Sequence, residues 1–383
     1  MQQLMRFCLI FSIFLGLTGC GNFPQVSAEE RLYLDLSLDF LGEYILPKQT
    51  FEQTKVGGLS GLTYDRQRDR FYAISDDRHQ PRFYTLKLDI DQHQPDKIQI
   101  EKVTVEKVTF LKNESGEIYP DNTIDAEGIA LTPRRTVFIA SEGSIKQNVM
   151  PFIGEFDLNS GQRQQNLRLP DRFFPNSPNQ TERSPQGIQH NLGFESLAVG
   201  ATSVLKEDPF RLFTVIENSL LQDIDPQKSV KSSPLRFLHY VINPIGDPVL
   251  IGENLYWLDP VPSGTLLSGL SDITTLEKEG YFLSLERNLT LAGFDIKIFQ
   301  VVNANASDTS RIASFKNDTN EIEPLRKQLL LDLENIGVEL DNLEGLALGP
   351  RLADGSQSLL LVSDDNFRPD QVTQFLLFRL KIS

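Results

Sequence analysis

The sequence predicts an all-β protein, a β-propeller of four-stranded blades arranged around one axis. Three observations lead to this prediction. A two-part phrase of acid-bearing turn and apolar strands recurs five times. Each repeat has room for about four strands, but the last has only three, and a strand near the N-terminus has no partner of its own. Repeated units must stack to bury their apolar faces, and four-stranded units stacked radially form a propeller.

The N-terminal strand is the first element. From residue 32 to residue 46 the chain alternates between apolar and polar side chains, with leucine at 32, 34, 36 and 38. Alternation with a period of two indicates a half-buried strand. The last repeat offers strands only at 346–348, 359–362 and 374–381. We therefore expect the N-terminal strand to complete the last blade, which removes a free sheet edge.

The repeats follow in order. Their first part is an acid-bearing turn entering an apolar strand, and their second part is an apolar strand ending in acids. Equivalent turn residues are Ser60, Glu127, Glu195, Ser271 and Glu344, at intervals of 67, 68, 76 and 73 residues. This spacing predicts five blades; six is the alternative, if the interval from Glu195 to Ser271 contains a further short sheet.

The first repeat shows the expected strands, at residues 61–64, 70–75, 83–88 and 98–111. Segments 113–123, 172–190 and 303–320 are rich in Asn, Pro, Ser and Gln, so they are expected to be loops. No long segment has the apolar period of a helix, and residues 321–333 are the best helical candidate.

The N-terminus predicts export. Arg6 precedes an apolar run that ends at Leu17-Thr18-Gly19-Cys20. A short positive segment and an apolar stretch of this length are typical of a secretory signal. Because the ending resembles a bacterial lipobox, we expect a signal peptide at 1–19, lipidation of Cys20, a tether at 20–30 and the propeller at 31–383. The chain would then be anchored by lipid to the cell envelope, in the periplasm or at the outer surface; an ordinary signal cleaved nearby is the alternative.

Composition restricts the ligands. The chain of 383 residues has 52 acidic and 37 basic residues, a formal charge of −15. Nucleic-acid binding needs a basic face, so it is excluded. The two cysteines, Cys8 and Cys20, both lie near the N-terminus, and there are four histidines. A site built from sulfur or several imidazoles is therefore disfavoured, and an oxygen-ligated cation such as Ca²⁺ is favoured.

The acids of the repeats are the candidate site. In a propeller the inner strands converge, so acids at equivalent strand ends are expected to form a ring at one mouth of the channel. Crowded carboxylates repel one another unless they bind cations or share protons. The metal-ligand candidates are Asp76, Glu127, Glu142, Glu195, Glu217, Glu286, Glu344 and Asp364. The alternative is structural: each acid accepts hydrogen bonds from backbone N–H groups and joins one blade to the next.

Several motifs resemble the phytase-like family, described as having an esterase-like activity of phytase. They are Asp125-Ala126-Glu127-Gly128, Gly193-Phe194-Glu195-Ser196, Ser284-Leu285-Glu286-Arg287 and Leu343-Glu344-Gly345-Leu346. The resemblance runs from about residue 38 to residue 381, with Ser196 standing where glycine is expected. It implies an exported hydrolase of phosphate esters or related esters, with Ca²⁺ as the implied cofactor.

The expected reaction is hydrolysis of a phosphoric ester by a water activated at the acidic mouth. The candidate catalytic residues are Glu127, Glu195, Glu286, Arg287 and Glu344, with Arg287 binding phosphate because a guanidinium matches phosphate oxygens. One alternative is a non-catalytic propeller that binds a ligand or metal. Another is a lactonase-like or ester-cleaving propeller with His79 or His190 as base. The expected partners are a small phosphorylated or ester substrate and, through Cys20, a membrane; we expect a monomer.

Overall fold

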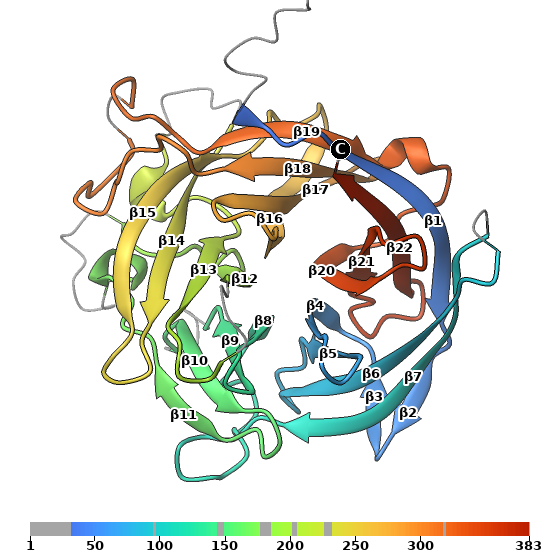
Figure 1. Ribbon diagram of the computed structural model, residues 1–383. Helices are drawn as coiled ribbons and strands as arrows, with labels where there is room; N and C mark the ends of the chain where they lie inside the picture. Colours follow the sequence, from blue (N-terminus) through green and yellow to red (C-terminus); the bar gives the residue numbers. More distant parts are fainter. Residues whose placement is uncertain are drawn as a thin grey trace, which may run out of the picture. The chain divides into compact units, whose positions relative to one another are not determined.

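Five four-stranded antiparallel sheets surround a common axis in the computed structural model (Figure 1). The structure describes residues 32–94, 97–143, 149–176, 185–200, 205–225, 232–316 and 319–382. The expected signal peptide, Cys20 and the tether lie outside these residues. The prediction of five blades is confirmed for the unit Asp35–Ser383, and the six-blade alternative is wrong.

Each blade takes its strands in chain order from the axis outward. Blade 1 is β4 (Leu59–Asp65), β5 (Arg70–Ser75), β6 (Arg82–Asp91) and β7 (Gln99–Phe110). Blade 2 is β8 (Ala126–Leu131), β9 (Thr136–Ser141), β10 (Phe152–Asp157) and β11 (Arg163–Asn166). Blade 3 is β12 (Phe194–Gly200), β13 (Phe210–Ile216), β14 (Pro234–Ile242) and β15 (Val249–Trp257). Blade 4 is β16 (Thr265–Thr275), β17 (Tyr281–Thr290), β18 (Gly293–Val302) and β19 (Arg326–Asp332).

Blade 5 joins the two ends of the unit. It contains β20 (Leu343–Arg351), β21 (Gln357–Ser363), β22 (Thr373–Ile382) and, as its outer strand, β1 (Leu36–Leu46). The β1–β22 ladder is antiparallel and runs from Leu36 opposite Ile382 to Leu46 opposite Thr373. The expected closure by the N-terminal strand is therefore confirmed. A short hairpin of β2 (Gln49–Phe51) and β3 (Thr54–Val56) then leads into blade 1.

The helical candidate at residues 321–333 is wrong, because β19 occupies most of it. This strand pairs with β18 from Arg326 opposite Val302 to Asp332 opposite Lys297, which satisfies backbone groups that an unpaired β18 edge would expose. The described residues contain only short 3-10 turns, at Asp171–Phe173, Leu221–Asp223 and Leu333–Ile336. None of the helices among these residues has the length and apolar character needed to span a membrane.

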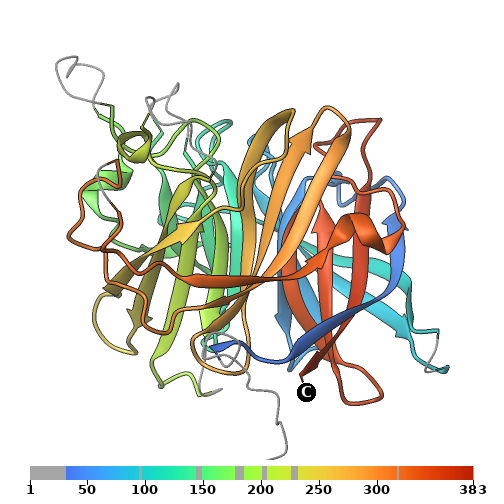
Figure 2. The same cartoon turned by 90° about the horizontal axis from the view of Figure 1, so that it is seen from above.

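Aromatic side chains pack the blades against one another. Phe213 of β13 meets Phe282 of β17 edge to face at 4.7 Å between ring centroids, and Phe237 of β14 meets the same ring at 5.1 Å. All three rings are buried. Edge-to-face pairs of this kind add to the apolar burial that holds neighbouring blades together. Figure 2 shows the blades side on, with the C-terminus at the lower face.

Near the axis the first strands lie very close together. A β-bulge interrupts the pairing of the first two strands in every blade, and the extra residues are Ser60, Glu127, Glu195, Ser271 and Glu344. In blades 1, 2 and 5 the residue after the bulge is a glycine that lies against the first strand of a neighbouring blade. In blade 2 it is Gly128, where a Cβ would lie 2.1 Å from the carbonyl oxygen of Glu195.

Replacing Gly128 with alanine is therefore expected to destabilise the propeller by about 1–3 kcal/mol, as overpacking of a rigid core does. Urea unfolding measures this cost. Gly252 of β15 is the matched control, because a Cβ there meets nothing within 4 Å. An equal effect of the two substitutions would contradict the close approach of β8 and β12.

Candidate functional site

One end of the propeller gathers the residues that follow the second strands. Asp76, Glu142, Glu217 and Asp364 come directly after β5, β9, β13 and β21. Each donates its backbone N–H to the turn that opens the first strand of its own blade, for example Asp76 to Gly58 O at 2.7 Å and Glu217 to Gly193 O at 2.6 Å. Because β22 starts beside Ser363 and ends at Ile382, these residues lie at the end opposite the C-terminus.

The bulge residues Glu127, Glu195 and Glu344 lie close to these four acids at the same end of the propeller. Burial, followed by the charges of Asp76, Asp125, Glu142 and Glu195, raises the pKa of Glu127 well above its usual value. Burial, followed by the charges of Glu217, Glu142 and Glu344, likewise raises the pKa of Glu195 well above its usual value. Residues from all five blades thus converge. We call them the carboxylate ring: Asp76, Asp125, Glu127, Glu142, Glu195, Glu217, Glu344 and Asp364, with Arg287.

Glu286 is not part of the ring, so its predicted position is wrong. The β16–β17 ladder places Gly269 opposite Arg287, so Arg287 takes the position held by an acid in the other four blades. Glu286 points between blades 3 and 4. Its carboxylate accepts from Tyr256 Oη at 2.6 Å, from the backbone N–H of Asp259 at 2.7 Å and from Lys327 Nζ at 2.5 Å. These contacts join blades and leave it no part in the predicted site.

Arg287 neutralises part of the ring. Its Nη1 donates to Glu344 and to Asn342, and its Nη2 donates to Glu217 Oε1 at 3.1 Å. Only 13% of the side chain is exposed. Burial opposes the positive charge, but Glu344, Glu217 and Glu195 outweigh it and raise the pKa of Arg287 above its usual value. Its two terminal nitrogens are thus already bound to ring residues.

The structural alternative holds for other acids. Asp365 accepts from the backbone N–H of Gly58 at 2.9 Å and so joins blade 5 to blade 1. Asp272 accepts from the N–H of Leu346 at 2.7 Å and joins blade 4 to blade 5. Glu142 both joins two blades and belongs to the ring. Its Oε1 accepts a hydrogen bond from the backbone N–H of Gly193 in the next blade, and its carboxylate lies close to other ring carboxylates.

Two triads of carboxylates stand out within the ring. Asp76, Asp125 and Glu127 bring oxygens within 4.8 Å of one another, and so do Glu142, Glu195 and Glu217. Asp125 was not among the predicted ligands. The repeats could have identified Asp125. The residues two positions before the bulges are Gly58, Asp125, Gly193, Gly269 and Asn342, so only blade 2 has an acid at this position.

The ring holds protons when no cation neutralises it. Burial, followed by the charge of Asp125, raises the pKa of Asp76 to about 8, and burial raises that of Glu217 to about 7 against the pull of Arg287. Burial and the carboxylates of Glu344 and Asp76 also raise the pKa of Asp364. Asp76 and Asp125 share a hydrogen bond, as two crowded carboxyls do when one of them is protonated.

This arrangement sets the pH dependence of the cation-free protein. The ordinary pKa values are 3.8 for Asp76 and 4.5 for Glu217. The folded state therefore binds more protons than the unfolded state between about pH 4 and pH 8, so stability falls as the pH rises through this window. Melting in chelator is expected at a higher temperature near pH 5.5 than near pH 8. The opposite order would contradict the crowding of these carboxyls.

The rim of the ring carries Arg78 and two histidines. Arg78 Nε donates to Asp125 Oδ1 at 2.5 Å, its Nη2 donates to Asn191 Oδ1 at 2.6 Å, and 33% of the side chain is exposed. His190 is exposed, and its charge lowers the pKa of Asp125. His79 is exposed and pairs with Asp121 at 3.2 Å. Of the two candidate bases, only His190 is placed to act on a ring carboxylate.

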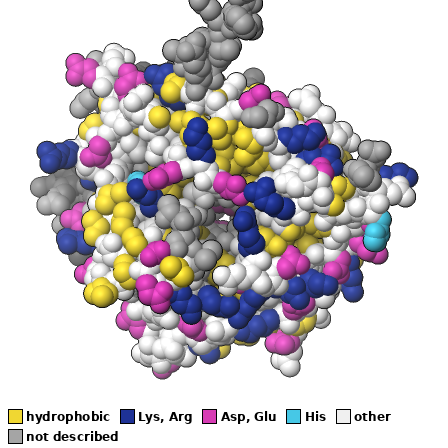
Figure 3. Space-filling model, in the orientation of Figure 1, with side chains coloured by type: hydrophobic (Ala, Val, Ile, Leu, Met, Phe, Trp, Pro, Cys, Tyr) yellow, Lys and Arg dark blue, Asp and Glu magenta, His cyan; other side chains and the backbone are white. Residues whose placement is uncertain are grey.

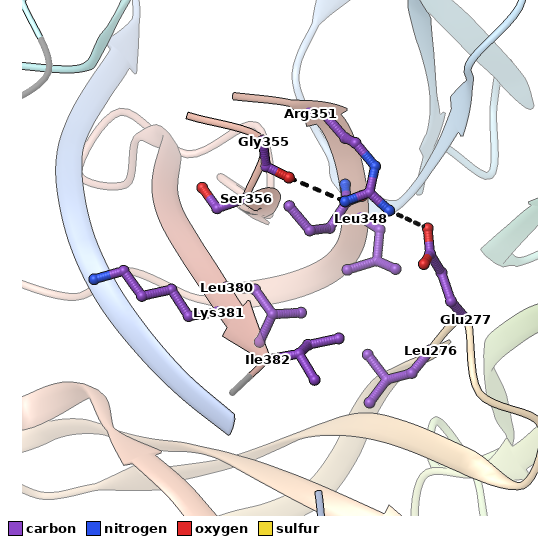
Figure 4. A pocket seen from close by; sticks show the side chains of 10 residues that line it. Leu276, Glu277, Leu348, Arg351, Gly355, Ser356, Leu380, Lys381 and Ile382 are labelled. Carbon is purple, nitrogen blue, oxygen red and sulfur yellow. Dashed lines mark hydrogen bonds and ion pairs between the residues drawn. The ribbon is translucent and has the colours of Figure 1, made fainter. Parts of the chain in front are cut away.

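A separate pocket lies at the other end of the propeller, between blades 4 and 5 (Figure 4). Its volume is about 300 Å³, and its lining includes Leu348, Leu380 and an ion pair of Arg351 with Glu277 at 2.5 Å. Figure 3 shows this end, where Lys and Arg side chains and Asp and Glu side chains lie around a narrow central opening. The candidate site is the carboxylate ring at the opposite end.

The chain belongs to the Phytase-like family, described as esterase-like activity of phytase, which matches residues 54–367. The match covers most of the propeller, including every residue of the carboxylate ring. It supports a propeller of hydrolase type. A search of curated proteins finds no match.

Solved structures that resemble the chain share little sequence with it. They include an endo-arabinase from Bacteroides thetaiotaomicron VPI-5482, with a TM-score of 0.42, 10% identity and coverage of 86% of this chain and 95% of that chain. The catalytic domain of a GH62 α-L-arabinofuranosidase from Coprinopsis cinerea has a TM-score of 0.39 and 11% identity, covering 90% and 97%. The N-terminal domain of Nup159 has a TM-score of 0.34 and 14% identity, covering 91% and 96%. At these scores the likenesses carry no weight for function.

Proposed function

We propose that the chain is an exported hydrolase of phosphoric esters that works at the carboxylate ring with Ca²⁺. The observation that carries this proposal is the convergence of side chains at one mouth of a propeller of the Phytase-like family. Blades 1, 2, 3 and 5 contribute acids, and blade 4 contributes Arg287. Oxygen donors alone, several of them buried, fit a hard cation.

We assign the residues of the ring different roles in hydrolysis. A divalent cation held by ring carboxylates such as Glu195 and Glu344 would supply Lewis-acid chemistry to a phosphoryl oxygen and to a water molecule. Asp76, which shares a hydrogen bond with Asp125, is our candidate for the group that gives a proton to the leaving oxygen. Glu127, Glu195 and Glu344 orient the water or hold the cation. Because the terminal nitrogens of Arg287 are bound to ring residues, the partly exposed Arg78 is better placed to meet phosphate.

Hydrolysis assays test this function. The purified full chain is incubated with phytate and with bis(4-nitrophenyl) phosphate, with Ca²⁺ or with chelator. We expect turnover that needs Ca²⁺ and that falls about 10²–10⁴-fold in Asp76→Asn, as loss of a general acid does. The Glu286→Gln variant, which alters a buried acid outside the ring, is expected to keep the activity. No turnover with any divalent metal would contradict catalysis.

A non-catalytic binding propeller is the second candidate. The ion pairs of Arg287 and Arg78 favour this candidate. Both side chains donate to acids, so they offer little free positive charge to a highly phosphorylated ligand. In this case Ca²⁺ raises the melting temperature while neither substrate is consumed.

Attachment to the cell envelope completes the proposal. β1 begins at Leu36 beside Ile382, at the end opposite the carboxylate ring. We propose that a lipid anchor at Cys20 attaches the chain to the membrane. We propose that the protein works as a monomer. Labelling with a palmitate analogue that is lost in Cys20→Ser tests the anchor, and light scattering tests the monomer.

A further inference from the structure

The two triads of the ring differ in what already neutralises them. In the first triad, Arg78 lies 2.5 Å from Asp125, and Asp76 shares a hydrogen bond with the same carboxyl. The positive side chain of Arg78 thus already balances part of its charge. The second triad consists of Glu142, Glu195 and Glu217. Arg287 donates to Glu217 Oε1, and Glu217 and Glu195 share a hydrogen bond, but neither contact involves Glu142.

Glu142 marks the second triad as incomplete. The residue is 2% exposed, and its Oε1 accepts from the backbone N–H of Gly193. Its Oε2 is buried as well, yet within the described part of the chain no donor reaches it. A buried carboxylate oxygen without a partner loses its hydration and gains nothing in return, which is costly. This atom belongs to a carboxylate with one oxygen within 4.8 Å of an oxygen of Glu195 and of an oxygen of Glu217.

We propose that Glu142, Glu195 and Glu217 form the first cation site of the ring, with Glu142 Oε2 as a direct ligand to a hard divalent cation such as Ca²⁺. Three carboxylates from blades 2 and 3 supply only oxygen donors, which suit Ca²⁺ and disfavour softer metals. The backbone bond from Gly193 holds the Glu142 carboxylate in place, so the site is ordered before the cation arrives. The inference rests on the proposed function only for the choice of cation.

Isothermal titration calorimetry with CaCl₂ on the chelator-treated full chain tests this assignment. The wild type is expected to bind Ca²⁺ at a first, tighter site. Glu142→Gln keeps the shape and the acceptor for Gly193 but removes the charge, so the affinity of that site should fall at least about tenfold. Glu195→Gln is expected to act in the same way. Without cation both variants should melt no lower than the wild type, because each removes a crowded buried charge.

Two variants serve as comparisons. Glu286→Gln removes a buried acid outside the ring and should leave Ca²⁺ binding unchanged. Asp125→Asn alters the first triad and should keep the tighter site. Unchanged affinity in Glu142→Gln would overturn the inference, and so would loss of the tighter site in Asp125→Asn alone. Ca²⁺ binding without turnover would contradict the proposed hydrolase but not this cation site. Turnover together with unchanged Ca²⁺ affinity in Glu142→Gln would contradict this cation site but not the proposed hydrolase.

Discussion

Replacing Arg287 with glutamine is expected to cost about 3–5 kcal/mol of folding free energy near neutral pH, because it leaves buried carboxylates without their positive partner. Arg287 binds Glu217 and Glu344 at once, and little of its side chain is exposed. Lysine at this position keeps the charge but cannot reach both acids with a planar fork, so an intermediate loss is expected. Ca²⁺ should restore part of the stability in both variants, since it neutralises the same carboxylates.

Urea unfolding in chelator and in Ca²⁺ measures this effect. Arg351→Gln is the matched control, because Arg351 pairs with Glu277 at the other mouth and half of its side chain is exposed. Exposed pairs of this kind contribute about 0–1 kcal/mol. If Arg287→Gln proves as stable as this control, the ring is not the charged, crowded cluster described above.

Replacing Arg236 with glutamine is expected to have an effect of similar size, about 3–5 kcal/mol, at a place remote from the ring. Arg236 of β14 is fully buried and binds Asp223 through Nε and Nη2 at 2.7 and 2.9 Å, and Glu253 through Nη1 at 2.5 Å. Its guanidinium also lies 4.0 Å from the ring centroid of Phe315. The variant therefore leaves the buried Asp223 without its positive partner, leaves Glu253 with Arg172 alone, and loosens the segment that leads from β18 to β19.

Unfolding and limited proteolysis test this second effect together. Cleavage between residues 303 and 325 should become faster in Arg236→Gln, while the affinity for Ca²⁺ stays unchanged. Arg211 gives the control, since its pair with Glu279 is largely open to solvent and Arg211→Gln should cost little. Equal stability of the two variants would contradict a buried ionic cluster in blade 3.

The repeats made the architecture predictable. A turn and two strands recur at similar spacing, so the sequence favoured five blades over six and predicted the equivalence of Ser60, Glu127, Glu195, Ser271 and Glu344. The structure adds a bulge at each of these positions. The unpartnered N-terminal strand and the incomplete last repeat predicted blade closure, because an open sheet edge is unfavourable. The helical candidate at 321–333 was wrong because pairing with β18 outweighed a weak local pattern.

The site was predicted less completely, and Glu286 shows why. Side chains alternate across a strand, so an error of one residue moves a side chain to the other face of the sheet. The pattern of acids favoured Glu286 as the ring residue of blade 4. The ladder instead places Arg287 there, and the pairing register of β16 with β17 cannot be counted from the sequence because two bulges interrupt it. Asp125 was missed because it stands outside the bulge position that defined the ring.

The most direct test of the account is a crystal structure of the full chain soaked with Tb³⁺ as a substitute for Ca²⁺. We predict an anomalous peak bounded by the carboxylates of Glu142, Glu195 and Glu217, with oxygens at about 2.3–2.6 Å, the range of Ca²⁺ ligands. A peak outside the carboxylate ring would contradict it. So would an empty ring in which these acids are bridged only by protons.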